Sequence, residues 1–493
     1  MRAFVLGSNE RGEVEMQITR RQMLASASAL CFPAGGAVSL PNVVYILADD
    51  LGIGDLGCYN PESKIPTPNM DLLAREGMRF TDMHSPSSVC TPTRYGILTG
   101  RYCWRTKLKQ GVLDGESPYL IEPGRLTVAG MLKEKGYRTA AIGKWHLGLG
   151  NAWKTDYGKA LRPGPLEAGF GSFFGIPASL DMPPYVYVED DRVVEAPTSK
   201  IEGIREQRGI FWRGGGIAPS FRHIDVLPKL TERAVKFLED QKGSKSPFFL
   251  YLALTSPHTP WVAVEAFRGR SQAGPYGDFV AQTDDAVGQV MTAIRRAGLE
   301  ANTLVMLTSD NGAHWTPEEI ERHQHRANGS LRGQKADIYE GGHRIPFLAR
   351  WPGKIRAGSV NSQLGCLTDL MATVAELTGV SLAQEAGEDS FSFVPALLGS
   401  KPRTALRQAI VHHSAQGVFA IREGRWKLVL GRGSGGFSEP KKIIPKPGEP
   451  AGELYDLDVD SREQTNLYEK KPEVVKRLTA LLEKYQREGR SRV

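Results

Sequence analysis

The sequence predicts an α/β fold: a large, mostly parallel sheet flanked by helices, with a smaller C-terminal antiparallel sheet plus helix. The first observation behind this prediction is that continuous apolar runs alternate with amphipathic helical patterns through most of the chain. The second is that short apolar runs follow one another at hairpin spacing near the C-terminus. We therefore expect a leader segment at residues 1–39, one large domain at 40–400 and a C-terminal subdomain at 401–493.

Four apolar runs of the large domain predict buried strands, because they are continuous rather than alternating. They occupy residues 42–50 (NVVYILADD), 138–143 (RTAAIG), 246–254 (SPFFLYLAL) and 302–312 (NTLVMLTSDNG). Helical patterns lie between them at residues 67–77, 127–137 and 279–298. In the first of these, Thr67 can cap the helix, Pro68 fits its first turn and Gly77 ends it.

Two further regions differ from this alternation. Residues 151–225 are rich in glycine, proline and aromatic residues, and we expect a long insertion there. Toward the C-terminus, short strands are predicted at residues 408–414, 417–424 and 425–431, followed by the segment 453–460 and an amphipathic helix from about 472 to 486. This pattern predicts the small antiparallel sheet plus helix.

The composition is that of an ordinary globular protein, with 41% hydrophobic and 24% charged residues among 493. That length allows a large buried core. The five cysteines are too few and too scattered for a disulfide framework, and no CxxC pair indicates a zinc site. The formal charge of +7, from 62 basic and 55 acidic residues, favours anionic partners without identifying one. Because no signature of RNA or DNA binding is present, we expect no nucleic-acid partner.

The N-terminal segment resembles a twin-arginine export signal, because Arg20 and Arg21 precede a weakly apolar stretch rich in Ala and Ser. That stretch is too short and too polar to span a membrane stably. Cys31 raises the alternative of a lipoprotein anchor, although Leu30 before it fits a lipobox poorly, and a disordered tail is the other alternative. No later segment offers about 20 uninterrupted apolar residues. We therefore expect an exported, periplasmic or extracellular protein without stable membrane insertion.

Carboxylate and amide side chains end two of the predicted strands. Asp49 and Asp50 close one strand, and Asp310 and Asn311 close another. Ligands of parallel sheets bind beyond the carboxyl ends of the strands. Four oxygen-bearing side chains at one sheet edge suit a hard divalent cation, Ca²⁺ or Mg²⁺, which would offset the repulsion between the carboxylates. For either pair alone, the alternative is helix capping or turn formation.

Basic side chains also follow predicted strands. Lys144 and His146 follow one strand and are two residues apart, so they face the same way in an extended segment. His258 follows another strand and lies between two prolines, while Lys335 lies in a polar loop. Each residue alone is equally consistent with an ordinary polar or surface position. Their shared placement after strands favours a common site.

Cys90 begins an apparent helix, CTPTRYGILTG, at residues 90–100. Helix starts attract anions and lower thiol pKa values. Arg94 is one turn further on and lies on the same helix face. Taken alone, this pattern predicts either a nucleophilic thiol or a plain buried cysteine.

These residues lie in motifs that resemble the formylglycine-dependent sulfatases, a family of the alkaline-phosphatase-like superfamily. CTPTR (90–94) fits the C-x-P-x-R signature of that family, and LTGRY follows it as expected. The chain is also similar to the family in the following motifs, which occur in the family's order: ILADDLG (46–52), GKWHLG (143–148), SPHTP (256–260), TSDNG (308–312) and YEGGHRIP (339–346). The match covers roughly residues 40–350 and, more weakly, the C-terminal subdomain.

The resemblance implies hydrolysis of sulfate esters through a modified Cys90. In this family a formylglycine-generating enzyme oxidises the motif cysteine to formylglycine (3-oxoalanine), and Pro92 and Arg94 are part of what that enzyme reads. Hydrated formylglycine is a geminal diol. One hydroxyl attacks sulfur and displaces the alcohol, giving a covalent sulfate–enzyme intermediate, and the other expels sulfate as the aldehyde forms again.

The resemblance also implies a metal centre, usually calcium, with Mg²⁺ as the other option. The family's metal ligands match Asp49, Asp50, Asp310 and Asn311, and the residue made from Cys90 completes the shell together with a sulfate oxygen. The metal would polarise the sulfate and favour an ionised nucleophile.

Five further residues match the family's catalytic groups. Arg94 and Lys144 match residues that stabilise the diol oxyanion. His146 matches the base that takes the proton of the second hydroxyl when sulfate is released. His258 and Lys335 match substrate-binding residues near the bridging oxygen, where one can protonate the leaving group. Cationic donors aimed at developing charge would supply much of the rate enhancement.

Two other functions fit parts of the pattern. Phosphate mono- or diester hydrolysis occurs on the same fold, and a non-catalytic protein that binds sulfated glycans would leave Cys90 unmodified. The motifs SPHTP and YEGGHRIP favour the sulfatase, with sulfated carbohydrates as the expected substrates. Candidate contacts to the substrate, each with a structural role as the alternative, are His84, Arg213, His223, His314 and Trp315. Of these we assign His314 to substrate binding.

Overall fold

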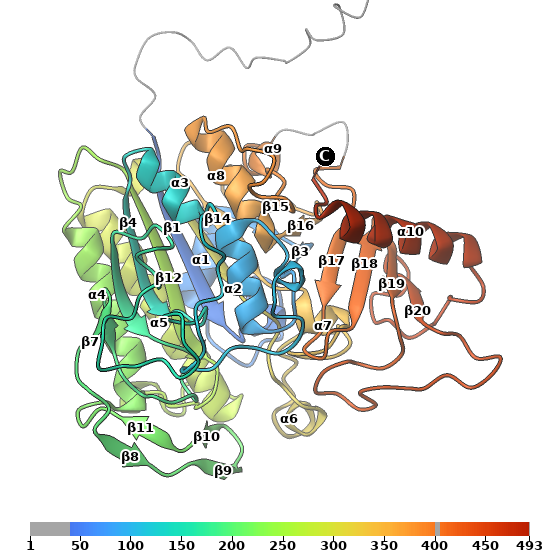
Figure 1. The fold of residues 1–493 in the computed structure, drawn as a ribbon, viewed down its shortest axis with the longest axis horizontal. Helices are drawn as coiled ribbons and strands as arrows, with labels where there is room; N and C mark the ends of the chain where they lie inside the picture. The colour runs from blue at the N-terminus through green and yellow to red at the C-terminus, as the bar shows by residue number, and fades with distance from the viewer. Residues whose placement is uncertain (1–39, 400–404, 493) are drawn as a thin grey trace, which may run out of the picture. The chain divides into compact units, whose positions relative to one another are not determined.

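A ten-stranded sheet forms the centre of the computed structural model, which describes residues 40–399 and 405–492 (Figure 1). Its strands follow the order β15-β2-β14-β13-β1-β12-β4-β5-β6-β7. Their bounds are β1 Asn42–Asp49, β2 Met78–Phe80, β4 Arg138–Lys144, β5 Ser172–Ile176, β6 Val188–Glu189, β7 Arg192–Val193, β12 Phe248–Pro257, β13 Thr303–Ser309, β14 Phe347–Arg350 and β15 Ser359–Asn361.

The middle of this sheet is parallel, and the four strands predicted from apolar runs all lie in it. Strands β13, β1, β12, β4 and β5 are hydrogen-bonded in parallel in that order. Antiparallel pairing begins at β14 on one side and at β6 on the other. All eight residues of β1 are buried, which explains its continuous apolar sequence. The predicted mostly parallel sheet is therefore confirmed.

Helices cover both faces of the sheet. On one face α2, α3 and α8 pack together, and on the other α5 packs against both α1 and α4 (Figure 1). The bounds of these helices are α1 Pro68–Glu76, α2 Cys90–Thr99, α3 Val128–Glu134, α4 Val226–Glu239, α5 Gly274–Arg296 and α8 Leu370–Thr378. The short helices are α6 Pro317–His323, α7 Glu340–His343 and α9 Val394–Leu397. The three helices predicted between the strands correspond to α1, α3 and α5, and the helix predicted to begin at Cys90 is α2.

The glycine- and proline-rich region 151–225 is only partly an insertion, because β5 within it is a parallel strand of the central sheet. Four of its other strands form two small antiparallel pairs, β8 with β11 and β9 with β10. The bounds of these strands are β8 Ser199–Ile201, β9 Ile204–Gln207, β10 Ile210–Trp212 and β11 Gly215–Ile217. A further parallel pair, β3 Met83–His84 and β16 Gly365–Cys366, lies outside the central sheet.

The C-terminal part contains the predicted antiparallel sheet and helix. Its strands, in the order β17-β18-β19-β20, are Ile410–His413, Phe419–Glu423, Trp426–Val429 and Glu453–Asp456. Helix α10, Pro472–Glu488, packs on β18 and β19. It buries Val474, Leu478, Leu482 and Tyr485 at helical spacing, so one apolar face of an otherwise polar helix covers the sheet.

The leader predicted at residues 1–39, with Arg20, Arg21, Leu30 and Cys31, lies outside the described residues. Within the described ranges, no helix has both the length and the apolar character needed to cross a bilayer.

Gly143 lets β4 pass close to β12 just before Lys144. Its φ of +121° is in the region that side chains disfavour, and a Cβ there would lie 1.8 Å from the carbonyl oxygen of Ala253. A side chain at residue 143 would therefore have to displace the backbone of the neighbouring strand. The strand register that brings Lys144 to the sheet edge depends on this glycine.

We expect Gly143→Ala to lower the free energy of unfolding by about 3 kcal/mol or more, because backbone strain and a clash with Ala253 add. Gly136→Ala is the matched control, since Gly136 has a φ of +82° but no atom within 4 Å of the position of an added Cβ. That variant should lose only about 1 kcal/mol. Urea unfolding measures the free energy of unfolding of both variants. Equal losses in Gly143→Ala and Gly136→Ala would contradict the role given to the close packing of β4 against β12.

Candidate active site

Strand ends bring the predicted residues to one edge of the sheet. Asp49 is the last residue of β1, and Lys144 is the last residue of β4. Asp310 directly follows β13, and His258 directly follows β12. Because these strands are parallel neighbours, their carboxyl ends open on the same edge.

A buried acidic cluster forms at this edge. Candidate ligand atoms from four side chains all lie within 4.8 Å of one another, and these side chains are Asp49, Asp50, Cys90 and His258. The two other predicted ligands adjoin the group: the backbone N–H of Asp50 donates to Asp310 Oδ1 at 3.3 Å, and Asn311 Nδ2 donates to Asp50 Oδ1 at 2.7 Å. The structure thus brings all the predicted metal ligands together and adds His258 to their neighbourhood.

The residues present fit a hard cation. Asn311 Oδ1 is buried and has no hydrogen-bond partner among the described residues. A buried amide oxygen without a partner is costly unless a cation or water fills the place. The neighbouring oxygens are carboxylates, the ligands that Ca²⁺ and Mg²⁺ prefer. This cluster can therefore hold a metal ion.

Three basic side chains surround the carboxylates. Arg94 donates from Nε and Nη2 to Asp310 Oδ2 at 3.0 and 2.8 Å. Lys144 Nζ lies 2.7 Å from Asp49 Oδ2. Lys335 Nζ lies 2.8 Å from both carboxylate oxygens of Asp50. Each carboxylate of the cluster consequently has a basic partner.

Nearby basic side chains determine the protonation state of the Asp49 carboxyl. Burial alone would raise the pKa of its carboxyl, but Lys144, His258, Arg94 and Lys335 together hold that pKa well below its usual range. In the same way, burial opposes the charge of Lys335, but Asp50 beside it raises the pKa of that ammonium overall. Asp49 and Lys335 are therefore both charged at neutral pH.

Asp310 behaves differently from Asp49. Burial and the neighbouring charge of Asp49 raise the pKa of Asp310 to about 6, against the opposing effect of Arg94. Below that pH the carboxyl of Asp310 takes up a proton. Because a carboxylate must be ionised to act as a metal ligand, a cation at this residue would compete with a proton.

Cys90 is the first residue of α2, and its Sγ lies 3.7 Å from Asp49 Oδ1. The helix start predicts a lowered thiol pKa, but burial raises the pKa of Cys90 to about 12, despite the opposing effects of Lys144 and Lys335. The unmodified thiol is therefore protonated at neutral pH and is a weak nucleophile. Of the two roles that the local sequence predicts, the reactive thiolate is the one that this environment disfavours.

His146 is a neutral base beside the cluster. Burial, followed by the charges of Lys144 and Arg94, lowers the pKa of its imidazole well below the usual value. Nε2 lies 2.7 Å from the carbonyl oxygen of Leu113 and therefore carries the proton, while Nδ1 has no partner among the described residues. The lone pair of Nδ1 is thus free to accept a proton.

His258 lies between the cluster and two residues that the sequence reasoning missed. Its Nε2 is 3.7 Å from Asp50 Oδ2, and its Nδ1 is 2.7 Å from the carbonyl oxygen of Thr259. Ser179 Oγ lies 3.3 Å from His258 Nε2 and 3.2 Å from Lys144 Nζ, and Asp181 Oδ1 lies 3.9 Å from His258 Nδ1. Ser179 and Asp181 follow β5, so its recognition as a parallel strand would have indicated them.

A pocket of about 460 Å³ opens above these groups. Cys90, His146, His258 and Lys335 line it together with His314. Its wall contains further side chains that the sequence did not indicate, among them Met182, Arg205, Arg208, Phe211 and Phe437. Most of these come from the region 151–225, whose loops have no periodic pattern from which their positions could be predicted.

Of the five candidate substrate contacts, only Arg213 and His314 line this pocket. The other three do not line it, and each has the structural surroundings that were the alternative for it. His84 lies in a separate buried group and pairs with Asp82 at 2.8 Å. Trp315 packs against Tyr276, and His223 stacks on Trp212. These three rings therefore pack against other side chains outside the lining of the pocket.

Comparison with known proteins agrees with this geometry. The family model described as Sulfatase matches residues 41–380, and one described as N-sulphoglucosamine sulphohydrolase, C-terminal, matches residues 334–488. The chain belongs to the sulfatase family. It is an enzyme that hydrolyses sulfuric esters, and the fold above is that of this family.

Individual sulfatases resemble the chain over most of its length. An N-acetylgalactosamine-6-O-sulfatase of Bacteroides thetaiotaomicron is 34% identical over 90% of this chain and 92% of its own. Arylsulfatase A of Homo sapiens is 37% identical over 89% of this chain and 85% of its own. A solved structure from B. thetaiotaomicron, described under the metabolism of multiple glycosaminoglycans, has a TM-score of 0.81 and 34% identity, covering 90% of this chain and 99% of that one.

We expect Asp50→Asn to weaken Ca²⁺ binding by at least about tenfold, because it removes a carboxylate charge from the cluster. Affinity of the native protein should also fall as the pH is lowered from 7 to 5, since the Asp310 carboxyl, with a pKa of about 6, must lose its proton to bind a cation. Isothermal titration calorimetry measures both effects. Asp181→Asn, in the same pocket but outside the acidic cluster, is the control, and an equal loss in that variant would contradict the assignment.

Proposed function

We propose that the chain removes sulfate from sulfated carbohydrates at this pocket, using a formylglycine made from Cys90. The observation that carries the proposal is the position of Cys90, at a helix start, beside Asp49 and facing the pocket. The similarity to an N-acetylgalactosamine-6-O-sulfatase supports a sugar substrate. A formylglycine-generating enzyme is the partner that this modification requires during maturation.

In this proposal Asp49, Asp50, Asp310 and Asn311 hold Ca²⁺, with Mg²⁺ as the other option, next to residue 90. Such an ion would polarise the sulfate and favour an ionised nucleophile. Formylglycine would supply a hydroxyl nucleophile and a release route through the second hydroxyl, neither of which a protonated buried thiol offers.

The basic side chains orient and stabilise anionic groups. Arg94 is fixed by its two contacts to Asp310 and by donation from Nη1 to the carbonyl oxygen of Lys144 at 2.9 Å. Arg94 and Lys144 stabilise negative charge at residue 90, and Lys335 binds the sulfate. Because these donors are already held in place by carboxylates, little reorganisation is needed when charge develops.

The two histidines have separate roles. His146 accepts a proton at Nδ1 when sulfate is released, because its imidazole is neutral and that nitrogen is free. His258, which also lines the pocket, serves the sulfate and the departing alcohol.

His314 binds the sugar. Burial, then Arg208 and Lys335, lowers the pKa of its imidazole to about 3, so it is neutral and can both donate and accept hydrogen bonds with hydroxyl groups. Its ring lies 4.9 Å from that of Phe437, which also lines the pocket and offers an apolar surface.

We also propose that the enzyme is exported, because Arg20 and Arg21 precede a weakly apolar stretch. Detection of the mature enzyme in the periplasm or medium of its host would test this.

Cys90→Ala should abolish release of sulfate from a sulfated sugar while leaving thermal unfolding unchanged, because the nucleophile is lost and the fold is not. Cys366→Ala, at another buried cysteine remote from the pocket, is the control and should retain turnover. Mass spectrometry of the peptide containing residue 90 should find an aldehyde in the active native protein. Turnover by Cys90→Ala, faster turnover of the matching phosphate ester, or binding of sulfated sugar without any turnover would each reject the proposal.

Substrates with different leaving groups should distinguish the role of His146 from that of His258. A phenolate departs without a proton, whereas a sugar alkoxide needs one. His258→Ala should therefore lose more kcat/KM on a sugar sulfate than on an aryl sulfate, while His146→Ala should slow both by a similar factor. Steady-state kinetics on the two substrates measure these ratios. The reverse pattern, with the larger difference in His146→Ala, would exchange the two assignments.

A further inference from the structure

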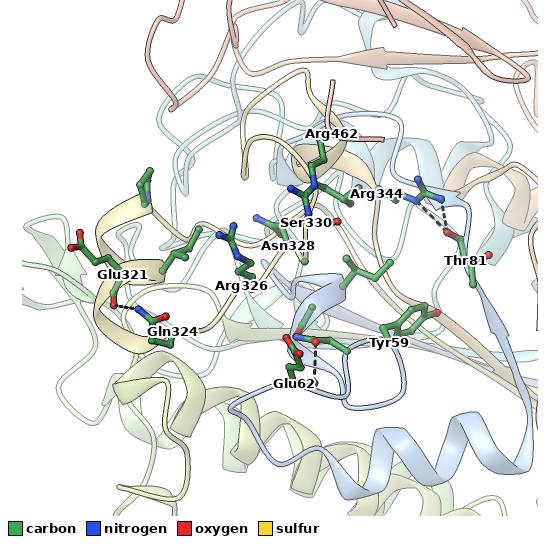
Figure 2. A pocket seen from close by; sticks show the side chains of 17 residues that line it. Tyr59, Glu62, Thr81, Glu321, Gln324, Arg326, Asn328, Ser330, Arg344 and Arg462 are labelled. Carbon is green, nitrogen blue, oxygen red and sulfur yellow. Dashed lines mark hydrogen bonds between the residues drawn. The ribbon is translucent and has the colours of Figure 1, made fainter. Parts of the chain in front are cut away.

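A second cavity, of about 1170 Å³, shares no lining residue with the active-site pocket (Figure 2). One wall comes from α6 and the loop after it, up to Leu331, and another from the segment Ile53–Glu62. Arg462 enters from the C-terminal part. Three arginines line the cavity, and they are Arg326, Arg344 and Arg462.

Two of these arginines have no partner of their own. Arg326 and Arg462 are exposed, and neither guanidinium forms a hydrogen bond or an ion pair with any described residue. Figure 2 shows that they come from separate segments of the chain, and both line the same cavity. Arg344 differs from them, because it donates to the carbonyl oxygen of Thr81 at 2.9 Å and pairs with Asp82 at 3.3 Å.

The backbone that carries Arg326 is held firmly. On one side of it, His325 is buried, and its Nε2 lies 2.8 Å from Asp55 Oδ1. On the other side, the carbonyl oxygen of Ala327 accepts from the N–H of Gly54 at 2.6 Å. These contacts fix the backbone from which the exposed side chain of Arg326 extends.

Arg462 is presented in the same way. The next residue, Glu463, is completely buried and has a φ of +53°, which is unusual for a residue with a side chain. Its carboxylate accepts from the N–H of Glu340 at 2.7 Å and lies 2.8 Å from Lys427 Nζ. The backbone next to Arg462 is therefore held in place by these buried contacts.

The acidic residues of the cavity do not neutralise these arginines. Glu62 and Glu321 line it, but neither forms an ion pair within the described part of the chain. In Figure 2, Glu321 points away from the three arginines. The aliphatic side chains of Ile53, Ile320 and Leu331 add apolar surface to the lining.

We propose that this cavity is an accessory binding site for the sulfate or carboxylate groups of an anionic polysaccharide. The guanidinium group matches planar and tetrahedral oxyanions with a rigid fork of donors, and two free guanidinium groups converge here. The aliphatic residues suit the carbon faces of sugar rings. The choice of a polysaccharide as ligand rests on the proposed function; the preference for an anion rests on the arginines.

One loop connects this site with the active-site pocket. Asn328, which lines the cavity, accepts from the N–H of Ala313 at 2.8 Å and donates to its carbonyl oxygen at 3.0 Å. Ala313 precedes His314, and the loop after α6, which carries Arg326 and Asn328, continues to Lys335; His314 and Lys335 both line the active-site pocket. A polymer bound at Arg326 is therefore held against the loop that forms part of the active site, so the accessory site should favour polymeric over small substrates.

The test measures binding of chondroitin sulfate chains to the Cys90→Ala protein, with neutral dextran of similar length as the uncharged probe. Adding Arg326→Ala and Arg462→Ala should weaken chondroitin sulfate binding about tenfold. Arg296→Ala with Arg356→Ala is the matched control, because it removes two exposed arginines that have no ion pair and lie outside the cavity; it should change the affinity less than about twofold. Dextran should not bind.

Activity separates this proposal from the proposed function. With Cys90 intact, the Arg326→Ala/Arg462→Ala variant should hydrolyse a small aryl sulfate at the native rate. If the native protein hydrolyses no sulfate ester, the proposed function fails, while the binding measurement still decides the accessory site. Equal weakening in the two double variants would overturn the accessory site. A nucleic-acid duplex that binds as tightly as chondroitin sulfate, with the same dependence on Arg326 and Arg462, would overturn the choice of a polysaccharide.

Discussion

The balance of buried charge around Cys90 is the constraint on which the site depends. Three carboxylates, those of Asp49, Asp50 and Asp310, face the basic side chains of Arg94, Lys144 and Lys335. A buried ion without a partner strongly destabilises the folded state. Removing one member of a pair therefore leaves the other as an uncompensated buried charge. The three charges of each sign cancel formally. A divalent cation added to this set would make the site positive, which suits an anionic ester.

Residues with positive φ values also lie at this edge of the sheet. Asp50, His146 and Ala336, the last next to Lys335, have φ values of +66°, +58° and +77°. Residues with side chains adopt this region rarely, and they do so where the surrounding structure holds them. Gly143 supplies a further positive φ at the end of β4. The free energy stored at this edge is offset by the packing of the parallel strands behind it, which are buried along almost their whole length.

The parts of the site that end strands could be predicted from the sequence, and the parts in loops could not. Asp49, Lys144, His258 and Asp310 follow recognisable apolar runs, and the topology of parallel strands alone brings them together. The wall of the pocket comes from residues such as Phe211 and Arg205, in loops with no period. Local reasoning left the role of His84 open, because its neighbours His343 and His412 lie far from it in the sequence. For Cys90, the helix start predicted a lowered pKa, but burial, which depends on the whole fold, has the larger effect.

Lys427 on β19 links the C-terminal sheet to the sheet edge. Its ammonium group is buried between two acidic side chains, 3.1 Å from Glu340 Oε1 and 2.8 Å from Glu463 Oε1. Glu340 begins α7, a few residues after Lys335. During synthesis from the N-terminus, Glu340 has Arg344 beside it, 3.6 Å from its Oε2, but it lacks Lys427 until about 90 more residues have been added. The contact that ties the C-terminal sheet to the segment beside Lys335 can therefore form only after most of the chain has been made.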